Sequence, residues 1–175
     1  MFRWRVISKL RALLLFLITA VALVLQATIF DFIRIFGVKP DLVLLLVIFY
    51  GFIHGSKEGA YFGFLSGLFI DFLSGQYIGL NALSKMAVGY FVGLGETKLY
   101  KENIFIATIV SMVGTVIGQT IYYLLLLVTG IHIPFINGLF HVIIPIAVYN
   151  GIFTILLYGR FYRSSTRGLL RIREM

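Results

Sequence analysis

The chain has 175 residues, of which 60% are hydrophobic and only 13% are charged. A soluble domain is about half apolar and about a quarter charged, and a small one lacks the interior volume to bury so much apolar surface. The net charge is +8, but the basic residues cluster at the two ends instead of spreading over a folded face, which argues against nucleic-acid binding. The composition predicts a protein that folds in a lipid bilayer.

Six apolar runs are candidates for membrane-spanning helices, each of which needs about 20 apolar residues. The first run, 12–30, is too long for a cleaved signal peptide, so we expect a retained helix. The second run, 41–54, is short for a span, and Pro145 predicts a kink in the last. We expect one polytopic membrane domain over 1–175, with a basic tail at 160–175 and helices near 12–30, 41–54, 58–75, 80–95, 103–129 and 139–159.

The distribution of lysine and arginine predicts the orientation of these spans, because cytoplasmic segments carry an excess of basic residues. Cytoplasmic termini leave only Arg34 and Lys39 outside, and Lys85 within a span. The inner segments then hold Arg3, Arg5, Lys9, Arg11, Lys57, Lys98, Lys101, Arg160, Arg163, Arg167, Arg171 and Arg173. Five spans would put one basic terminus outside, so we expect six. The basic tail either fixes this topology as solvated charge or lies as a surface helix on anionic lipid.

A glycine stripe at four-residue spacing runs along the third span, and position 71 of the series holds an aspartate. Small residues let helix backbones approach closely, which is a main source of attraction between helices in lipid. The fourth span carries Lys85 in the same spacing as two glycines. We expect a helix-packing or partner face made of Gly59, Gly63, Gly67, Gly75, Gly89 and Gly93, with Gly114 and Gly118 on the fifth span.

Asp71 and Lys85 are charges within spans, which are costly unless they are paired or wetted. In an antiparallel hairpin, residues at equal depth have numbers with a constant sum. One register aligns three pairs, namely Gly67–Gly89, Gly63–Gly93 and Asp71–Lys85. We therefore hypothesise an Asp71–Lys85 ion pair. The alternatives are that Asp71 faces a water-filled cleft or an outside partner.

The remaining polar residues do not form a pattern typical of catalysis or of metal binding. The three histidines are scattered without a partner at metal-ligand spacing, and the chain has no cysteine. We interpret Gln119, Asn150 and His141 as polar groups that are satisfied inside the bundle and do not bind a ligand. The sequence therefore predicts a protein that is not an enzyme and has no cofactor.

The stretch 39–93 is similar to the signature region of the bacterial rod shape-determining protein MreD family. The matching pieces are Pro40-Asp41 before a leucine-rich run, Gly59, Gly63 and Gly67, "DFLSG" with Asp71 and Gly75, Gly79-Leu80-Asn81-Ala82-Leu83, and Gly89-Tyr90. Lys85 is not part of the family motif, so the resemblance does not make its predicted ion pair a family-wide feature.

This resemblance implies a non-catalytic scaffold of the bacterial cell-elongation (rod) complex, located in the inner membrane. Such proteins bind the single-span protein MreC directly, and they act, directly or through it, with the MreB filament and with peptidoglycan synthases such as RodA and its transpeptidase. Their fold resembles the membrane substrate-binding subunits of energy-coupling factor transporters, so we expect an all-α integral membrane protein with six transmembrane helices. The alternative is such a vitamin-uptake subunit, although the first span lacks the AxxxA face by which those subunits dock.

Overall fold

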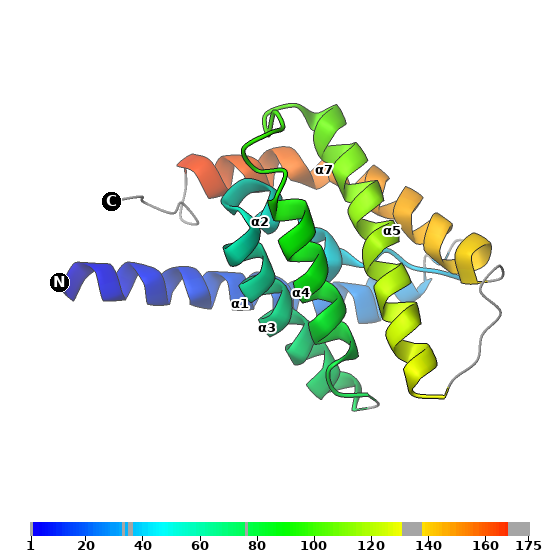
Figure 1. Cartoon of the computed structure of the whole chain (residues 1–175). Helices are drawn as coiled ribbons and strands as arrows, with labels where there is room; N and C mark the ends of the chain where they lie inside the picture. Colours follow the sequence, from blue (N-terminus) through cyan, green and yellow to red (C-terminus); the bar gives the residue numbers. More distant parts are fainter. Residues whose placement is uncertain (1, 33, 35–36, 76, 131–137, 168–175) are drawn as a thin grey trace.

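The computed structural model describes residues 2–32, 34, 37–75, 77–130 and 138–167 (Figure 1). Side chains are not described for residues 2–11, 31, 32 and 167. The described part of the chain is helical, with elements α1 (Phe2–Phe32), α2 (Leu42–His54), α3 (Ser56–Ser74), α4 (Leu80–Gly93), α5 (Ile104–Val128), η1 (Leu139–Ile143) and α7 (Ile144–Arg167).

The helices agree with the predicted runs except at the two ends of the chain. α1 begins at Phe2 instead of residue 12, and α7 continues to Arg167 instead of stopping at 159. The first part of the predicted basic tail is therefore helical. The rest of that tail, 168–175, and His132 lie outside the described residues.

α2 lies at the centre of the bundle and contacts α1, α3, α4, α5 and α7. Eleven of its 13 residues are buried. A helix that is apolar on every side is stable only when other helices surround it, and α2 has this pattern. With a rise of 1.5 Å per residue it is about 20 Å long, less than the roughly 30 Å hydrocarbon core of a bilayer. Asp41 and Leu42, at its start, are buried, so the helix begins within the bundle.

α3 and α4 pack as a close antiparallel hairpin, but not in the predicted register. A Cβ atom on Gly63 would meet the backbone of Lys85, and one on Gly67 would meet the backbone of Asn81. The predicted register paired Gly63 with Gly93 and Gly67 with Gly89. The residues of α4 that face these two glycines therefore come eight positions earlier in the chain than predicted. Asp71 accepts hydrogen bonds from the backbone N–H groups of Gly79 and Ala82, so the chain reverses closer to the end of α3 than the predicted pairing assumed.

Glycines from three helices meet at one point of this hairpin. Gly59 of α3 and Gly89 of α4 pack backbone against backbone, and a Cβ atom on Gly51 of α2 would lie 2.7 Å from the Gly89 carbonyl oxygen. Gly51 was not among the glycines predicted to form the packing face. Gly75 was wrongly assigned to the packing face: it ends α3 in the left-handed conformation, with φ 66°, and a Cβ atom there would meet nothing within 4 Å.

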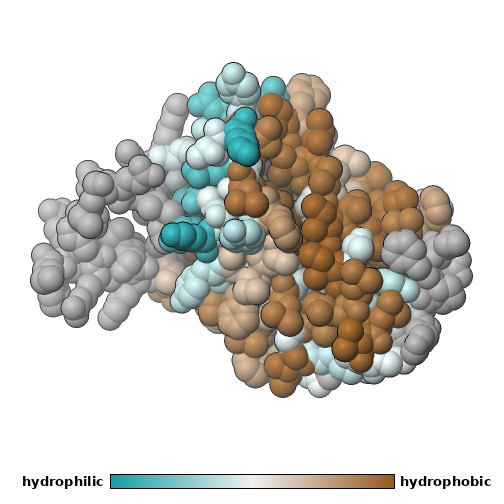
Figure 2. Space-filling model, viewed as in Figure 1, coloured by the Kyte–Doolittle hydropathy of each residue, from teal (hydrophilic) through white to brown (hydrophobic). Residues whose placement is uncertain are grey.

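The exposed surface of α5, and that of α7 as far as Leu157, is largely apolar. Figure 2 shows hydrophobic side chains over α5, and hydrophilic side chains gathered near the α4–α5 connection. Within the described residues, three helices are long and apolar enough to cross a membrane, with spans Ala12–Phe30, Ile104–Val128 and Leu139–Thr166. The chain is thus an all-α protein with the apolar helices of a membrane protein, and the six-span topology stays a prediction.

The predicted irregularity at Pro145 takes the form of a π-helical turn. This turn, η1, ends two residues before the proline. Proline has no backbone N–H and cannot complete the regular ladder of helix hydrogen bonds, so the preceding turn is irregular. His141 lies exposed on η1, which corrects its predicted position inside the bundle. On the same turn Ile143 is buried, so His141 and Ile143 lie on opposite sides of it.

Candidate functional site

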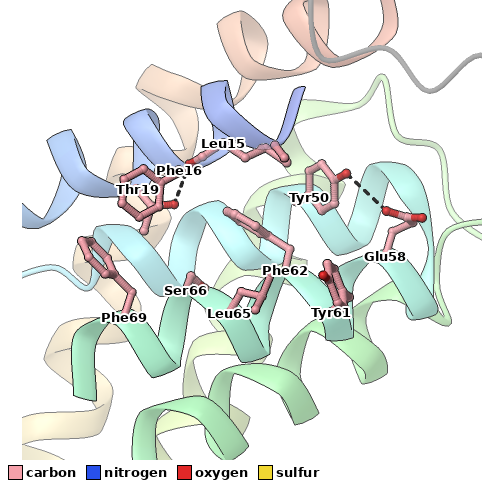
Figure 3. Close-up of a pocket in the computed structure, with 11 residues that line it drawn as sticks. Leu15, Phe16, Thr19, Tyr50, Glu58, Tyr61, Phe62, Leu65, Ser66 and Phe69 are labelled. Atoms are coloured by element: carbon pink, nitrogen blue, oxygen red, sulfur yellow. Dashed lines mark hydrogen bonds between the residues drawn. The ribbon is translucent and has the colours of Figure 1, made fainter. Parts of the chain in front are cut away.

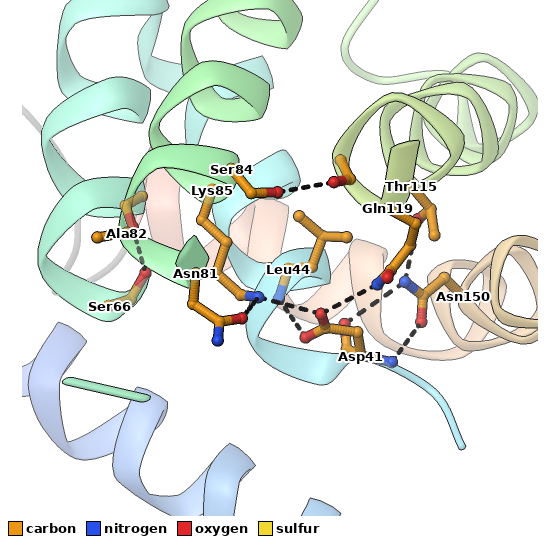
Figure 4. Close-up of polar contacts among 12 residues, drawn as sticks. Asp41, Leu44, Ser66, Asn81, Ala82, Ser84, Lys85, Thr115, Gln119 and Asn150 are labelled. Carbon is orange, nitrogen blue, oxygen red and sulfur yellow. Dashed lines mark hydrogen bonds and ion pairs between the residues drawn. The ribbon is translucent and has the colours of Figure 1, made fainter. Parts of the chain in front are cut away.

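Asp41 and Lys85 form a buried ion pair at the start of α2. Lys85 Nζ lies 3.1 Å from Asp41 Oδ2 and donates a second hydrogen bond, of 3.0 Å, to Asn81 Oδ1 (Figure 4). Asp41 is also the N-cap of α2, because its Oδ1 accepts a 2.9 Å hydrogen bond from the backbone N–H of Leu44. The positive end of the helix dipole and the lysine both stabilise this carboxylate. The pair joins α4 to the first turn of α2.

Asp71 caps the start of α4 from the end of the neighbouring helix. Its Oδ2 accepts hydrogen bonds from the backbone N–H groups of Gly79, at 2.8 Å, and Ala82, at 3.1 Å. Its Oδ1 accepts from the backbone N–H and the side-chain amide of Asn81, at 3.2 and 2.9 Å. Gly79, the N-cap of α4, has no side chain to do this. Asp71 therefore supplies the missing cap, and four donors satisfy its carboxylate.

The predicted Asp71–Lys85 ion pair is wrong, because Lys85 binds the other carboxylate, Asp41. Asn81 lies between the two predicted partners: its amide nitrogen donates to Asp71, and its amide oxygen accepts from Lys85. The alternatives of a wet cleft and of an outside partner are also wrong, because Asp71 is fully buried. The α3–α4 register explains the error, since it places Asp71 beside the start of α4 instead of beside Lys85.

The cluster extends to α5 and α7 through side-chain amides. Gln119 Nε2 of α5 lies 3.4 Å from Asp41 Oδ2. Asn150 of α7 accepts a 3.1 Å hydrogen bond from the backbone N–H of Asp41 and donates one of 3.0 Å to Thr115 Oγ1. Both amides are hydrogen-bonded between helices, as predicted. Asn150 is fully buried, so any loss of these partners would leave polar groups without hydrogen bonds.

Gly114 and Gly118 lie on the face of α5 that packs against α2 and α4. A Cβ atom on Gly114 would contact Ile48 and Val92, and one on Gly118 would contact Val88 at 2.8 Å. Ser84 of α4 donates a 2.7 Å hydrogen bond to the Gly118 carbonyl oxygen. These two glycines admit neighbouring side chains, whereas the glycines of the hairpin admit a neighbouring backbone.

Four of the residues that resemble the family motif come from two separated stretches and lie in or beside this cluster. Pro40 is buried and leads into Asp41, while Gly79 and Asn81 lie at the start of α4. Asp41 was not predicted to be the counter-ion of Lys85. An aspartate directly before an apolar helical run is a typical N-cap, and this signal predicts its helix contact but not its ionic partner.

The charged side chains of this cluster hold the helices of the bundle together. Each carboxylate caps a helix, and the one lysine of the cluster bridges a carboxylate and an amide. The cluster thereby fixes the starts of α2 and α4 against α3, α5 and α7. Buried charges that are fully hydrogen-bonded and paired specify one arrangement of helices, because any displacement would leave them unpaired in a medium of low dielectric constant.

Residues 6–163 match the family model described as rod shape-determining protein MreD. No curated protein and no solved structure matches the chain. The predicted likeness to the membrane subunits of vitamin-uptake transporters therefore rests on the sequence resemblance alone. The matched region contains the whole polar cluster and the glycine contact of the α3–α4 hairpin. Because the match covers most of its length, the chain belongs to the MreD family of rod shape-determining proteins.

Proposed function

We propose that this protein is a non-catalytic membrane scaffold of the bacterial cell-elongation complex. It binds an MreC-like single-span membrane protein directly. Through that protein, or by direct contact, it connects an MreB-like filament to peptidoglycan synthases such as RodA and its transpeptidase. This connection places wall synthesis along the filament and maintains rod shape.

The observation that carries the proposal, together with family membership, is how the charges within the bundle are used. Asp41, Asp71 and Lys85 bind helix N-termini, amides or each other. Asp41 borders a cavity together with Gln119, but its carboxylate oxygens are occupied by the Leu44 N–H, Lys85 and Gln119. Charged groups that perform chemistry are instead left available to a substrate. A bundle whose polar groups bind its own helices is rigid, which is the property that a scaffold for partner proteins needs.

The proposed orientation follows from the positions of the basic residues. Six crossings of the bacterial inner membrane leave both termini in the cytoplasm, together with the α2–α3 and α4–α5 connections. Lys57 lies near the first connection, and Lys98 and Lys101 lie in the second. This orientation obeys the excess of basic residues on cytoplasmic segments. It places the polar cluster in the periplasmic half of the bundle.

Co-purification tests the proposal. The tagged protein is extracted in mild detergent from membranes of the native host, and its companions are identified by mass spectrometry. The scaffold function predicts that an MreC-like protein is enriched over an unrelated single-span membrane protein. Enrichment of a transporter ATPase without an MreC-like protein would overturn it in favour of a vitamin-uptake subunit.

A further inference from the structure

A groove of about 340 Å³ lies between α1 and α7, with α2 at its base. α1 and α7 each contact α2, but within the described residues their backbones do not contact each other. Beyond one end of the groove the two helices touch through Phe30 and Phe153, whose ring centroids are 5.1 Å apart. At the other end the groove reaches Arg160 and Ser164 of α7. The first and last helices are therefore joined by side chains at one level and separated at the other.

The walls of this groove consist of large aliphatic side chains. Ile18, Val21 and Leu25 of α1 lie opposite Leu157 of α7. Val21 and Leu157 are exposed at 57% and 39%, so the groove is open to the medium around the bundle. The α1 wall extends over about two helical turns, or about 10 Å. A long apolar groove of this kind suits a hydrocarbon chain that lies along the helices.

The same lining is unfavourable for another helix. In lipid, helices associate where small side chains let their backbones approach closely. The small residues of this groove are Ala22, which is buried, and Ser164, which lies at the end. The large side chains on both walls would hold a neighbouring backbone at a distance, whereas a flexible acyl chain can fit between them.

Arg160 gives one end of the groove a positive charge. Its one hydrogen bond in the described part of the chain, of 3.4 Å, goes to the carbonyl oxygen of Leu156 in its own helix. A guanidinium group has five N–H donors, so others are available to a ligand. Ser164 lies one turn further along the same face of α7 and also lines the groove. The guanidinium and the hydroxyl can donate to the same phosphate group, which arginine binds through two parallel N–H groups.

A second groove of the bundle, between α1 and α3, carries the opposite charge (Figure 3). Its charged side chain is Glu58, in the first turn of α3, which accepts a hydrogen bond from the Tyr50 hydroxyl. A carboxylate repels a phosphate, so this groove is unfavourable for an anionic headgroup. The charge of Arg160 therefore distinguishes the groove between α1 and α7 as the one that attracts an anion.

We propose that the groove between α1 and α7 binds one anionic phospholipid. The phosphate of the lipid binds Arg160 and Ser164, and one acyl chain lies between the two helices. In the proposed orientation Arg160 is at the cytoplasmic end of α7, at the level where anionic headgroups attract basic residues. The bound lipid joins the first helix to the last where the protein itself leaves them apart. This inference goes beyond the scaffold function, and its test requires no partner protein.

Native mass spectrometry of the delipidated protein in detergent tests the recognition of charge. The probes are phosphatidylglycerol and phosphatidylethanolamine with identical acyl chains. We expect one phosphatidylglycerol to bind about fivefold more tightly, the factor expected from one basic residue near an anionic headgroup. Arg160→Gln should remove this preference, and Arg160→Lys should retain part of it. Arg163→Gln is the matched control, because Arg163 is an exposed arginine of the same helix that does not line the groove.

Fluorescence quenching tests the position of the lipid, because the chain contains no cysteine and can be labelled at a single introduced one. Val21→Cys, at the rim of the groove, is labelled with bimane in phosphatidylcholine nanodiscs that contain small fractions of phosphatidylglycerol with brominated acyl chains. A bound lipid predicts quenching that saturates at a low fraction of the brominated lipid. The matched control is Val24→Cys, which is 62% exposed on the same helix outside the groove, and its quenching should rise in proportion to that fraction. Adding Arg160→Gln to Val21→Cys should give the proportional response.

The outcomes decide between a bound lipid and the other possible occupants of the groove. Equal binding of the two lipids by the wild-type protein would overturn the proposal, as would an unchanged preference in Arg160→Gln. Equal quenching at the two cysteine positions would overturn the place assigned to the acyl chain. A dimer that forms in place of the lipid complex would assign the groove to a second copy of this chain and would also overturn the proposal. None of these results changes the co-purification of an MreC-like protein, which tests the scaffold function separately.

Discussion

Lys85 Nζ lies 3.1 Å from Asp41 Oδ2, which joins two residues that are 44 positions apart in the chain. Both side chains are buried, and Asp41 also caps the first turn of α2. The contact connects the most buried helix of the bundle to the α3–α4 hairpin. The pair is therefore a tertiary contact between helices. Its contribution to the stability of the fold depends on both partners being present.

The Asp41–Lys85 pair should show strong energetic coupling. Lys85→Met leaves the Asp41 carboxylate buried without its counter-ion, so the free energy of unfolding should fall by about 3–5 kcal/mol. Asp41→Asn combined with Lys85→Met should cost clearly less than the sum of the single changes. The measurement is SDS-induced unfolding in mixed micelles, followed by circular dichroism. Lys98→Met, an exposed change in the α4–α5 connection, is the control, and additive costs would contradict the pair.

Asp71 should be more sensitive to the loss of charge than an ordinary helix cap. In Asp71→Asn, one of the two acceptor oxygens is replaced by an NH₂ group that faces backbone N–H donors. Each donor left buried without a partner costs about 1–3 kcal/mol. The same unfolding assay should show less coupling between Asp71 and Lys85 than between Asp41 and Lys85. Equal coupling would return support to the ion pair predicted from the sequence.

The backbone contact at Gly89 should not tolerate a single methyl group. A Cβ atom there would meet the carbonyl oxygen of Gly59, which belongs to a helix backbone and cannot rotate away. Gly89→Ala should therefore cost at least about 1–3 kcal/mol, as in other overpacked cores. Gly159→Ala is the matched control, because its Cβ atom would meet nothing within 4 Å. If both variants have the same melting temperature in detergent, the close approach of α3 and α4 is not required.

Both termini should be accessible from the cytoplasm only. The reason is the concentration of basic residues on the segments that six crossings leave inside the cell. Alkaline phosphatase fused to either end should be inactive, and green fluorescent protein fused to either end should be fluorescent. An active phosphatase at one end would require an odd number of crossings.

Local patterns were sufficient to predict most of the helices. The run 41–54 predicted α2 to within one residue at its start and to the residue at its end. Its central position could not be predicted in the same way, because burial on every side depends on where the other helices pack. The length of α1 was underestimated because basic residues before Ala12 are poor signals of a span, although they continue the helix.

Several members of the polar cluster were predicted, but their contacts were not. Asp71 and Lys85 were hypothesised to pair with each other, and Gln119 and Asn150 were expected to be satisfied within the bundle; each of the four has a partner there. The pairing failed because the register of a hairpin depends on the path of its turn, which glycine spacing does not reveal. Asp41 was missed as an ionic partner because it comes from a helix that is adjacent in space and distant in sequence.

Depletion of the protein in its rod-shaped host, followed by microscopy, tests the scaffold function most directly. We predict that the cells widen and become round within a few generations, and that wild-type protein restores a constant width. Lys98→Met should restore the width too, whereas Gly89→Ala should fail when the α3–α4 hairpin cannot close. Cells that keep their rod shape and width after the protein has been lost would contradict the account.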